Sequence, residues 1–203
     1  MKVALIGVTG GVGSRVATEL LTRGHSVTGI ARHPEKSSPR TGLELKQGDA
    51  TNPSNLAPLL TSHDAVISAS RFQTSNSGAL VAAVKEAGVS RLLVVGGAAS
   101  LQVAPGKRLI DAPDFPEAYK AEALGGIQFL EALRNEKVLE WTFLSPSAEF
   151  VAGERTGKFR IGRDDLLIEA NGRSWISMED YAIALVDELE RPKHLRERFT
   201  VGY

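Results

Sequence analysis

Short apolar runs and amphipathic segments alternate along most of the chain. The first apolar run covers residues 3–6 and is followed by a glycine-rich turn, after which Val12, Val16 and Leu20 recur every four residues. Apolar side chains at this spacing indicate a helix, and a short run rich in β-branched residues indicates a buried strand. The opening stretch therefore predicts a strand, a glycine turn and a helix.

The same unit returns along the rest of the chain. Further strands are predicted at residues 25–31, 43–47, 64–69, 91–96 and 141–144, with a final edge strand at 199–202. Helices are predicted at residues 12–22, from 53 onward, 77–86, 117–135 and 177–190. Continuous apolar runs fit a parallel sheet covered on both faces, and alternating strands and helices with short links imply right-handed crossovers. The predicted fold class is α/β, a doubly wound parallel sheet with helices on both faces.

Two segments depart from this alternation. Residues 97–116 are predicted to form a long irregular loop. Residues 147–175 contain glycine-rich turns and short alternating pieces at 158–161 and 166–168, which predict a small C-terminal, hairpin-like insertion. We expect one domain over residues 1–203, with the insertion and the loop flanking the carboxyl ends of the strands, where they would determine substrate specificity.

Composition excludes several classes of function. The 24 basic and 24 acidic residues cancel, which gives no electrostatic basis for binding nucleic acid or an anionic membrane. No apolar run reaches the roughly 18 residues of a membrane span, and the chain has no cysteine. Because the apolar run of residues 3–6 leads straight into glycines, we expect no signal peptide. The four histidines are scattered without the spacing of a metal site. We expect a cytoplasmic protein, a monomer or small homo-oligomer, whose partner is a small-molecule acceptor.

The glycine turn has the spacing Gly7-x-x-Gly10-x-x-Gly13. Glycines allow a tight turn and close approach of the backbone, so that a pyrophosphate can lie against the amides at a helix N-terminus. Between a strand and a helix, this pattern predicts a Rossmann-type dinucleotide site, the alternative being a turn that only packs strand against helix. The candidate residues in the turn are Gly7, Thr9, Gly10, Gly11, Val12 and Gly13.

The end of the second predicted strand distinguishes the two nicotinamide cofactors. An NAD site would place an acidic residue there for the ribose 2′-hydroxyl, whereas this strand ends in Arg32. A guanidinium suits the 2′-phosphate, so the sequence favours NADP(H) over NAD(H). Arg15 could be a second phosphate partner. The alternative for both arginines is an exposed surface charge.

The ends of the following strands supply the remaining cofactor candidates. Asp49, with Ala50 beside it, could hold the adenine amino group, or Asp49 could simply form a turn or cap a helix. Ser68 and Ala69 are small residues that would leave room for a dinucleotide, and the same argument includes Ser145.

At this point the chain resembles the atypical short-chain dehydrogenase/reductase superfamily. The resemblance is carried by GVTGGVG in the first turn, ARHP at the second strand end, GDATNP, DAVISA and the C-terminal ISMEDYAIALVDELE. Within the superfamily the chain is most similar to small bacterial NAD(P)H-binding proteins known as NADH-flavin or biliverdin-type reductases, and to NmrA-like epimerase homologues.

The resemblance implies an active site of serine, tyrosine and lysine, the last two as Tyr-x-x-x-Lys on the helix after the fifth strand. Lys120 matches the lysine, but Pro116 stands four residues before it and Tyr119 is its direct neighbour. On a helix, adjacent side chains point about 100° apart. The usual dyad is therefore absent. Ser100 could match the serine of the superfamily or be an ordinary loop residue.

Three interpretations remain open. Tyr119 could act from an irregular helix start, or be a partly buried aromatic with a structural role. Lys120 could bind only ribose, leaving hydride transfer to an acceptor that needs no positioned acid. The protein could also bind NADP(H) without turnover. We expect an NADP(H)-binding oxidoreductase that reduces a flavin-like, quinone or carbonyl acceptor, with a non-catalytic NADP(H) sensor or an epimerase/dehydratase homologue as alternatives.

Overall fold

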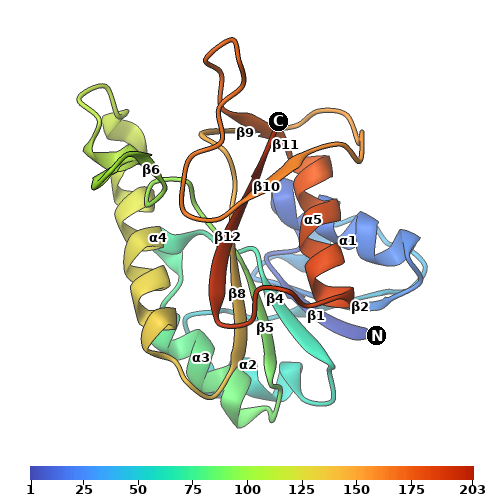
Figure 1. The fold of residues 1–203 in the computed structure, drawn as a ribbon. Helices are drawn as coiled ribbons and strands as arrows, with labels where there is room; N and C mark the ends of the chain where they lie inside the picture. Colours follow the sequence, from blue (N-terminus) through green and yellow to red (C-terminus); the bar gives the residue numbers. More distant parts are fainter.

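A single eight-stranded sheet forms the centre of the computed structural model, which describes all residues 1–203 (Figure 1). The strands stand in the order β10-β12-β8-β5-β4-β1-β2-β3, all parallel except β10. Their bounds are β1 Lys2–Ile6, β2 Ser26–Ala31, β3 Leu43–Gln47, β4 Ala65–Ser68, β5 Arg91–Val95, β8 Glu140–Ser145, β10 Arg160–Gly162 and β12 Glu197–Gly202. The first six parallel strands follow the 3-2-1-4-5-6 arrangement of doubly wound nucleotide-binding sheets, which confirms the predicted fold class.

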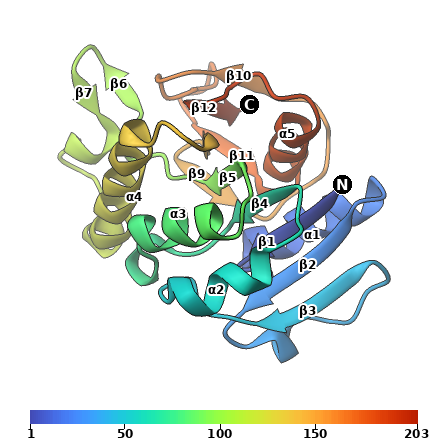
Figure 2. The same ribbon diagram turned by 90° about the horizontal axis from the view of Figure 1, so that it is seen from below.

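Helices cover both faces of the sheet, as Figures 1 and 2 show. One face carries α1 (Gly11–Thr22) and α5 (Met178–Glu190), and the other carries α2 (Pro53–Leu60), α3 (Ser77–Glu86) and α4 (Glu117–Asn135). Successive side chains of a strand point to opposite faces. Along β1, Leu5 accordingly enters the core beneath α1 and α5, and Ile6 enters the core beneath the other three helices. None of the helices is both long and apolar enough to cross a bilayer.

Side-chain caps begin three of the helices. Asn52 accepts a hydrogen bond from the amide of Asn55 at 3.2 Å, and Asn76 accepts one from Ala79 at 3.0 Å. Ser177 accepts from the amide of Asp180 at 3.0 Å. Such caps satisfy amides that have no partner within the helix. The Asp180 carboxylate does not return to the N-cap of α5 to complete a capping box, because it binds the insertion instead.

The C-terminal part of the sheet differs from the prediction. The strand expected at residues 199–202 is not an edge strand, because β12 pairs with β8 on one side and with β10 on the other. Residues 158–161 and 166–168 do not form a hairpin. The first segment overlaps β10, which pairs with the free edge of β12. The second segment does not pair with the first, and its Leu166 amide donates to the carbonyl of Gln102 at 2.9 Å. The other two strands of this region, β9 (Glu149–Val151) and β11 (Trp175–Ser177), pair in parallel with each other.

The segment after β5 is more ordered than the irregular loop predicted for residues 97–116. It contains an antiparallel ribbon of β6 (Gln102–Ala104) and β7 (Lys107–Arg108), which turns at Gly106 with a φ of 72°. A 3₁₀ turn, η3 (Leu109–Asp111), follows. Strands of two or three residues are too short to leave a periodic pattern in the sequence.

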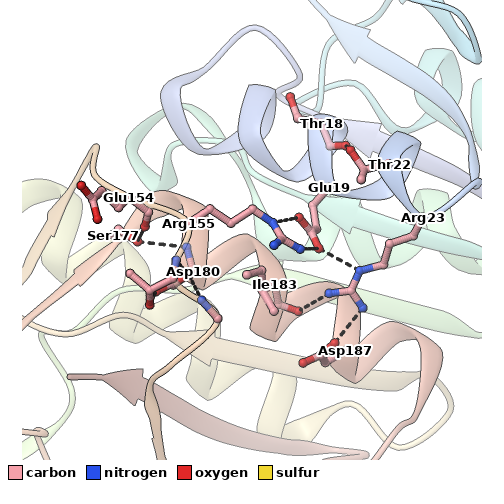
Figure 3. A network of polar contacts seen from close by, with 12 residues as sticks. Thr18, Glu19, Thr22, Arg23, Glu154, Arg155, Ser177, Asp180, Ile183 and Asp187 are labelled. Atoms are coloured by element: carbon pink, nitrogen blue, oxygen red, sulfur yellow. Dashed lines mark hydrogen bonds and ion pairs between the residues drawn. The ribbon is translucent and has the colours of Figure 1, made fainter.

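Figure 3 shows how the insertion is held against α1 and α5. Glu19 on α1 is 4% exposed and accepts hydrogen bonds from Arg155 of the insertion at 2.9 Å and from Arg23 at 2.8 Å. Arg23 also donates a hydrogen bond to Asp187 on α5 at 2.7 Å. The hydrogen bond from Arg155 is the main cause of a lowered pKa at Glu19, and Arg23 adds to it against the opposing effect of burial.

Asp180 provides the second anchor. Its side chain is fully buried and accepts hydrogen bonds from the amides of Thr156 and Gly157, both at 2.8 Å, and from the Tyr203 hydroxyl at 2.7 Å. A buried carboxylate is stable only when such donors replace its lost hydration. One residue of α5 therefore fixes both the insertion and the end of β12.

The lowered pKa of Glu19 predicts a pH-dependent contribution to stability. The unfolded chain has the ordinary pKa of about 4.5 and the folded chain a lower one, so the contribution is complete above pH 4.5 and is lost as the pH falls through the folded value. The difference in free energy of unfolding between the parent and Glu19→Gln, measured by urea titration from pH 7 to pH 3, should shrink below pH 4.5. Glu131→Gln, at an exposed carboxylate, is the control, and a difference that stays constant would contradict the role of Glu19.

Candidate functional site

The turn after β1 brings three backbone segments together at the carboxyl ends of the strands. Gly7 has a φ of 86°, and its amide donates to the carbonyl of Ile30 at 2.8 Å. A Cβ at Gly7 would stand 2.6 Å from the carbonyl oxygen of Ala69, and one at Gly13 would collide with the carbonyl of Gly7. Both positions require glycine, because a side chain there would force β1, β4 and α1 apart.

The N-terminus of α1 is open to an anion. Its N-cap is Gly10, which has no side chain to offer, and its first turn contains no acidic residue. The amides of Gly11, Val12 and Gly13 donate to no acceptor within the chain. Free amides at the positive end of a helix dipole form a binding site for phosphate groups.

A cavity of about 200 Å³ lies at this turn, and we refer to it as the glycine-turn cavity. It contains seven of the twelve predicted cofactor residues, which are Gly7, Thr9, Gly10, Arg32, Asp49, Ala50 and Ala69. The amides of Gly11, Val12 and Gly13 follow directly in α1, while the Val12 side chain packs against the core. Ser68 and Ser145 are 3% and 0% exposed and line neither this cavity nor the larger one described below.

The two charged residues predicted at this cavity have different surroundings. Arg32 is exposed and forms no ion pair. Asp49 accepts hydrogen bonds from the amide and hydroxyl of Thr51 at 2.9 and 2.8 Å, which lower its pKa. One oxygen of Asp49 thus forms a turn, which was the alternative to the predicted contact with adenine. Arg15, the other candidate phosphate partner, is paired with Glu179 at 2.5 Å.

A second, larger cavity of about 760 Å³ lies beyond the ends of β4, β5 and β8, and we refer to it as the aromatic cavity. Its walls include the side chains of Phe72, Phe115, Tyr119 and Phe150, together with the backbone of residues 96–100. Arg71 lines the glycine-turn cavity and Phe72 lines the aromatic cavity. The two cavities therefore follow one another along the carboxyl edge of the sheet, where ligands of open α/β sheets bind.

Phe72 is held in place by α4. Its amide donates to Glu122 at 2.7 Å. A Cβ at Gly125 would come within 3.0 Å of the Phe72 Cβ, and one at Gly126 would come within 3.1 Å of the Phe72 ring. Its ring also packs edge-on against Phe129, about one turn further along α4, with ring centres 5.5 Å apart. The pair of glycines within a helix was a signal in the sequence for such a close approach, whereas Phe72 itself carried none.

Of the three predicted catalytic residues, Tyr119 and Ser100 line the aromatic cavity and Lys120 does not. The Lys120 amine is paired with Glu117 at 2.5 Å on the surface of α4, and Lys120 does not line the aromatic cavity. Tyr119 lines the cavity mouth but is 66% exposed, so its interpretation as a partly buried aromatic is wrong. Ser100 lines the cavity, and its hydroxyl oxygen accepts a hydrogen bond from Arg198 at 3.2 Å.

Arg198 is a residue that sequence reasoning missed. It lies on β12, is 8% exposed, and donates to Asp164 of the insertion at 2.8 Å as well as to Ser100 and, at 3.4 Å, to Ser145. Its position in a strand gave no indication of a polar role, because its partners are 34 to 98 residues away. No group of three His, Asp or Glu side chains is arranged to hold a metal ion.

The strand order, the glycine turn and the open helix N-terminus define a dinucleotide-binding protein of the Rossmann class. Comparison with known families gives the same result at finer resolution. Residues 7–192 match the model of the NAD(P)H-binding family, and the chain belongs to that family. Its membership confirms the resemblance that the sequence motifs indicated.

Three relatives illustrate how far the similarity extends. The protein YwnB of Bacillus subtilis is 40% identical over 212 residues, covering 99% of this chain and 98% of the relative. A solved structure from Bacteroides thetaiotaomicron, named as an epimerase, is 42% identical with a TM-score of 0.94 and covers 100% and 96% of the two chains. Another from Streptococcus pneumoniae, named as an NADH-flavin reductase, is 35% identical with a TM-score of 0.86 and covers 100% and 99%.

Tyr181 joins the strand ends that form the floor of the site. Its fully buried hydroxyl donates to the carbonyl of Leu144 at 2.6 Å and accepts from the amide of Gly96 at 3.3 Å. Burial raises the pKa of this phenol well above its ordinary value, so it remains a hydrogen-bond donor.

Tyr181→Phe should therefore lower the free energy of unfolding by about 1–2 kcal/mol. The loss stays moderate because Gly96 and Leu144 keep their mutual hydrogen bond of 2.8 Å. Urea unfolding at unchanged m-value would measure it. Tyr119→Phe removes the same atom at an exposed position and should change stability by less than about 0.5 kcal/mol; equal effects would show that the buried contact contributes nothing.

Proposed function

We propose that the protein is an NADP(H)-dependent reductase that delivers hydride to a planar acceptor, flavin-like or a quinone, bound in the aromatic cavity. The observation that carries this proposal is the succession of the two cavities along one sheet edge. The glycine-turn cavity includes Gly10, directly before the free amides of α1, and Arg32, and the aromatic cavity beside it is larger and lined by rings. A dinucleotide anchored in the first would place its reactive end at the second.

The residues at the glycine turn fit the cofactor. Gly7 and Gly13 leave space that a Cβ would fill, the first amides of α1 are free for a pyrophosphate, and Arg32 stands at the end of β2 where a ribose 2′-phosphate is recognised. When bound, NADPH supplies a hydride. The chain's part is to hold and orient the cofactor and to exclude water from the acceptor.

The surroundings of Lys120 favour an acceptor that needs no positioned acid. The lysine of a Tyr-x-x-x-Lys dyad would face the cavity, but Lys120 is paired with Glu117 outside it. Glu122 is occupied by the amides of Phe72 and Gln73. Flavin and quinone acceptors can take their proton from water once reduced, so they suit this cavity better than a simple carbonyl compound. The name of the Streptococcus pneumoniae relative, an NADH-flavin reductase, supports the same class.

The preference for NADPH is testable through Arg32. NADPH should raise the melting temperature of the parent protein more than NADH does, because a charge-assisted hydrogen bond to the 2′-phosphate contributes about 1.5–3 kcal/mol. Arg32→Ala should remove this difference and weaken NADPH binding about 10- to 100-fold while leaving NADH binding within about twofold. The control is Arg163→Ala, at an arginine that is 75% exposed and distant in the fold on the β10 side. Equal shifts with both cofactors in the parent would refute the preference.

Turnover tests the reaction itself. Oxidation of NADPH should be seen with riboflavin, FMN or a quinone as acceptor, and Lys120→Ala should keep the rate within about twofold, because removing an exposed ion pair has little effect. A large loss in Lys120→Ala would show that the lysine does reach the cofactor. Clear NADPH binding without turnover on any acceptor would instead identify the protein as a cofactor sensor.

A further inference from the structure

We propose that the aromatic cavity selects an uncharged, planar aromatic acceptor bearing carbonyl oxygens, and that it discriminates against the same ring system when it carries a phosphate. For flavins, this means riboflavin in preference to FMN. The turnover of such a compound rests on the proposed reductase function, whereas its binding does not.

The walls fit a flat ring. Phe72, Phe115 and Phe150 come from three different segments, the 3₁₀ turn η2 (Phe72–Thr74), the stretch before α4, and β9. Phe72 is fixed from behind by α4, as described above, so that wall of the cavity is preformed. Aromatic side chains stabilise a planar ligand by stacking and by excluding water from its faces.

The donors in this cavity are neutral. The amides of Gly97, Ala98, Ala99 and Ser100 have no acceptor within the chain. The Ser100 hydroxyl oxygen accepts a hydrogen bond from Arg198, and its proton has no acceptor within the protein and remains available. The charge of Arg198 itself is balanced by Asp164. Neutral N–H and O–H donors suit carbonyl oxygens, such as those of a flavin or quinone ring.

The charges around the aromatic cavity are negative. Its charged lining residues are Asp114, Glu122 and Glu149, and no lysine or arginine lines it. Glu149 is paired with Arg173 at 2.7 Å and Glu122 accepts two amides, whereas Asp114 forms no ion pair. A phosphate would thus meet Asp114 and Glu122, two carboxylates without a paired cation, and like charges disfavour binding. The phosphate-binding groups of the site belong to the glycine-turn cavity, which the cofactor would fill.

Binding can be measured independently of turnover through flavin fluorescence. Riboflavin and FMN would be titrated with protein saturated with NADP⁺, which keeps the FMN phosphate out of the glycine-turn cavity. At low ionic strength riboflavin should bind about tenfold more tightly than FMN. In roughly 0.5 M salt the two dissociation constants should become nearly equal, because salt screens the repulsion between the FMN phosphate and the carboxylates. Equal or tighter binding of FMN at low salt, or no binding of either flavin, would overturn the proposal.

A pair of charge-reversal variants locates the effect. Asp114→Lys should reduce the preference for riboflavin over FMN at least threefold at low salt, because it replaces the unpaired carboxylate with a cation. Glu131→Lys makes the same change of net charge on α4 outside the cavity and should leave the ratio unchanged. Equal effects of the two variants would mean that only the overall charge matters. Selective riboflavin binding without NADPH oxidation would uphold this proposal while refuting the reductase function.

Discussion

The close approach of the first turn to the neighbouring strand ends is the constraint on which the site depends. Gly7 and Gly13 lie so near to each other and to Ala69 that any side chain would separate β1, β4 and α1. The first amides of α1 have no partner within the helix, as at any helix N-terminus, and Gly10 offers no side chain to cap them. The chain thus forgoes hydrogen bonds and side-chain packing at the centre of its sheet, which a protein does where a ligand replaces them.

Most of the sheet could be predicted from the sequence, because its strands are continuous apolar runs and its helices have a clear period. The helix starts predicted at residues 53, 77 and 177 agree with the structure to within one residue, and the caps there are Asn52, Asn76 and Ser177. The errors fall where pairing is decided by distant segments. Nothing in residues 158–161 distinguishes a hairpin from a strand that adds to β12, because both structures have the same alternation of apolar and polar residues.

The glycine-turn cavity was predictable for a related reason, and the aromatic cavity was not. The spacing of Gly7, Gly10 and Gly13 locates the glycine turn within one strand–turn–helix unit. The other walls come from the segments at and after the ends of β2, β3 and β4, which the predicted parallel order of the sheet places beside that turn. The aromatic cavity is assembled from η2, the segment around Phe115, α4 and β9, and its order depends on contacts such as that between Phe72 and Glu122, which are 50 residues apart. Sequence similarity pointed to Lys120 and Tyr119, but the direction in which a helix presents its side chains was needed to place the lysine outside the cavity.

The two cavities also give the sheet edge an electrical polarity. Arg32, Arg71 and the helix N-terminus outweigh Asp49 at one end, and Asp114, Glu122 and Glu149 lie at the other. The field of such an arrangement exerts a torque on an elongated ligand whose phosphates are concentrated toward one end. A dinucleotide that diffuses toward the protein would therefore be turned to the productive orientation before first contact, and this alignment would weaken as ionic strength rises.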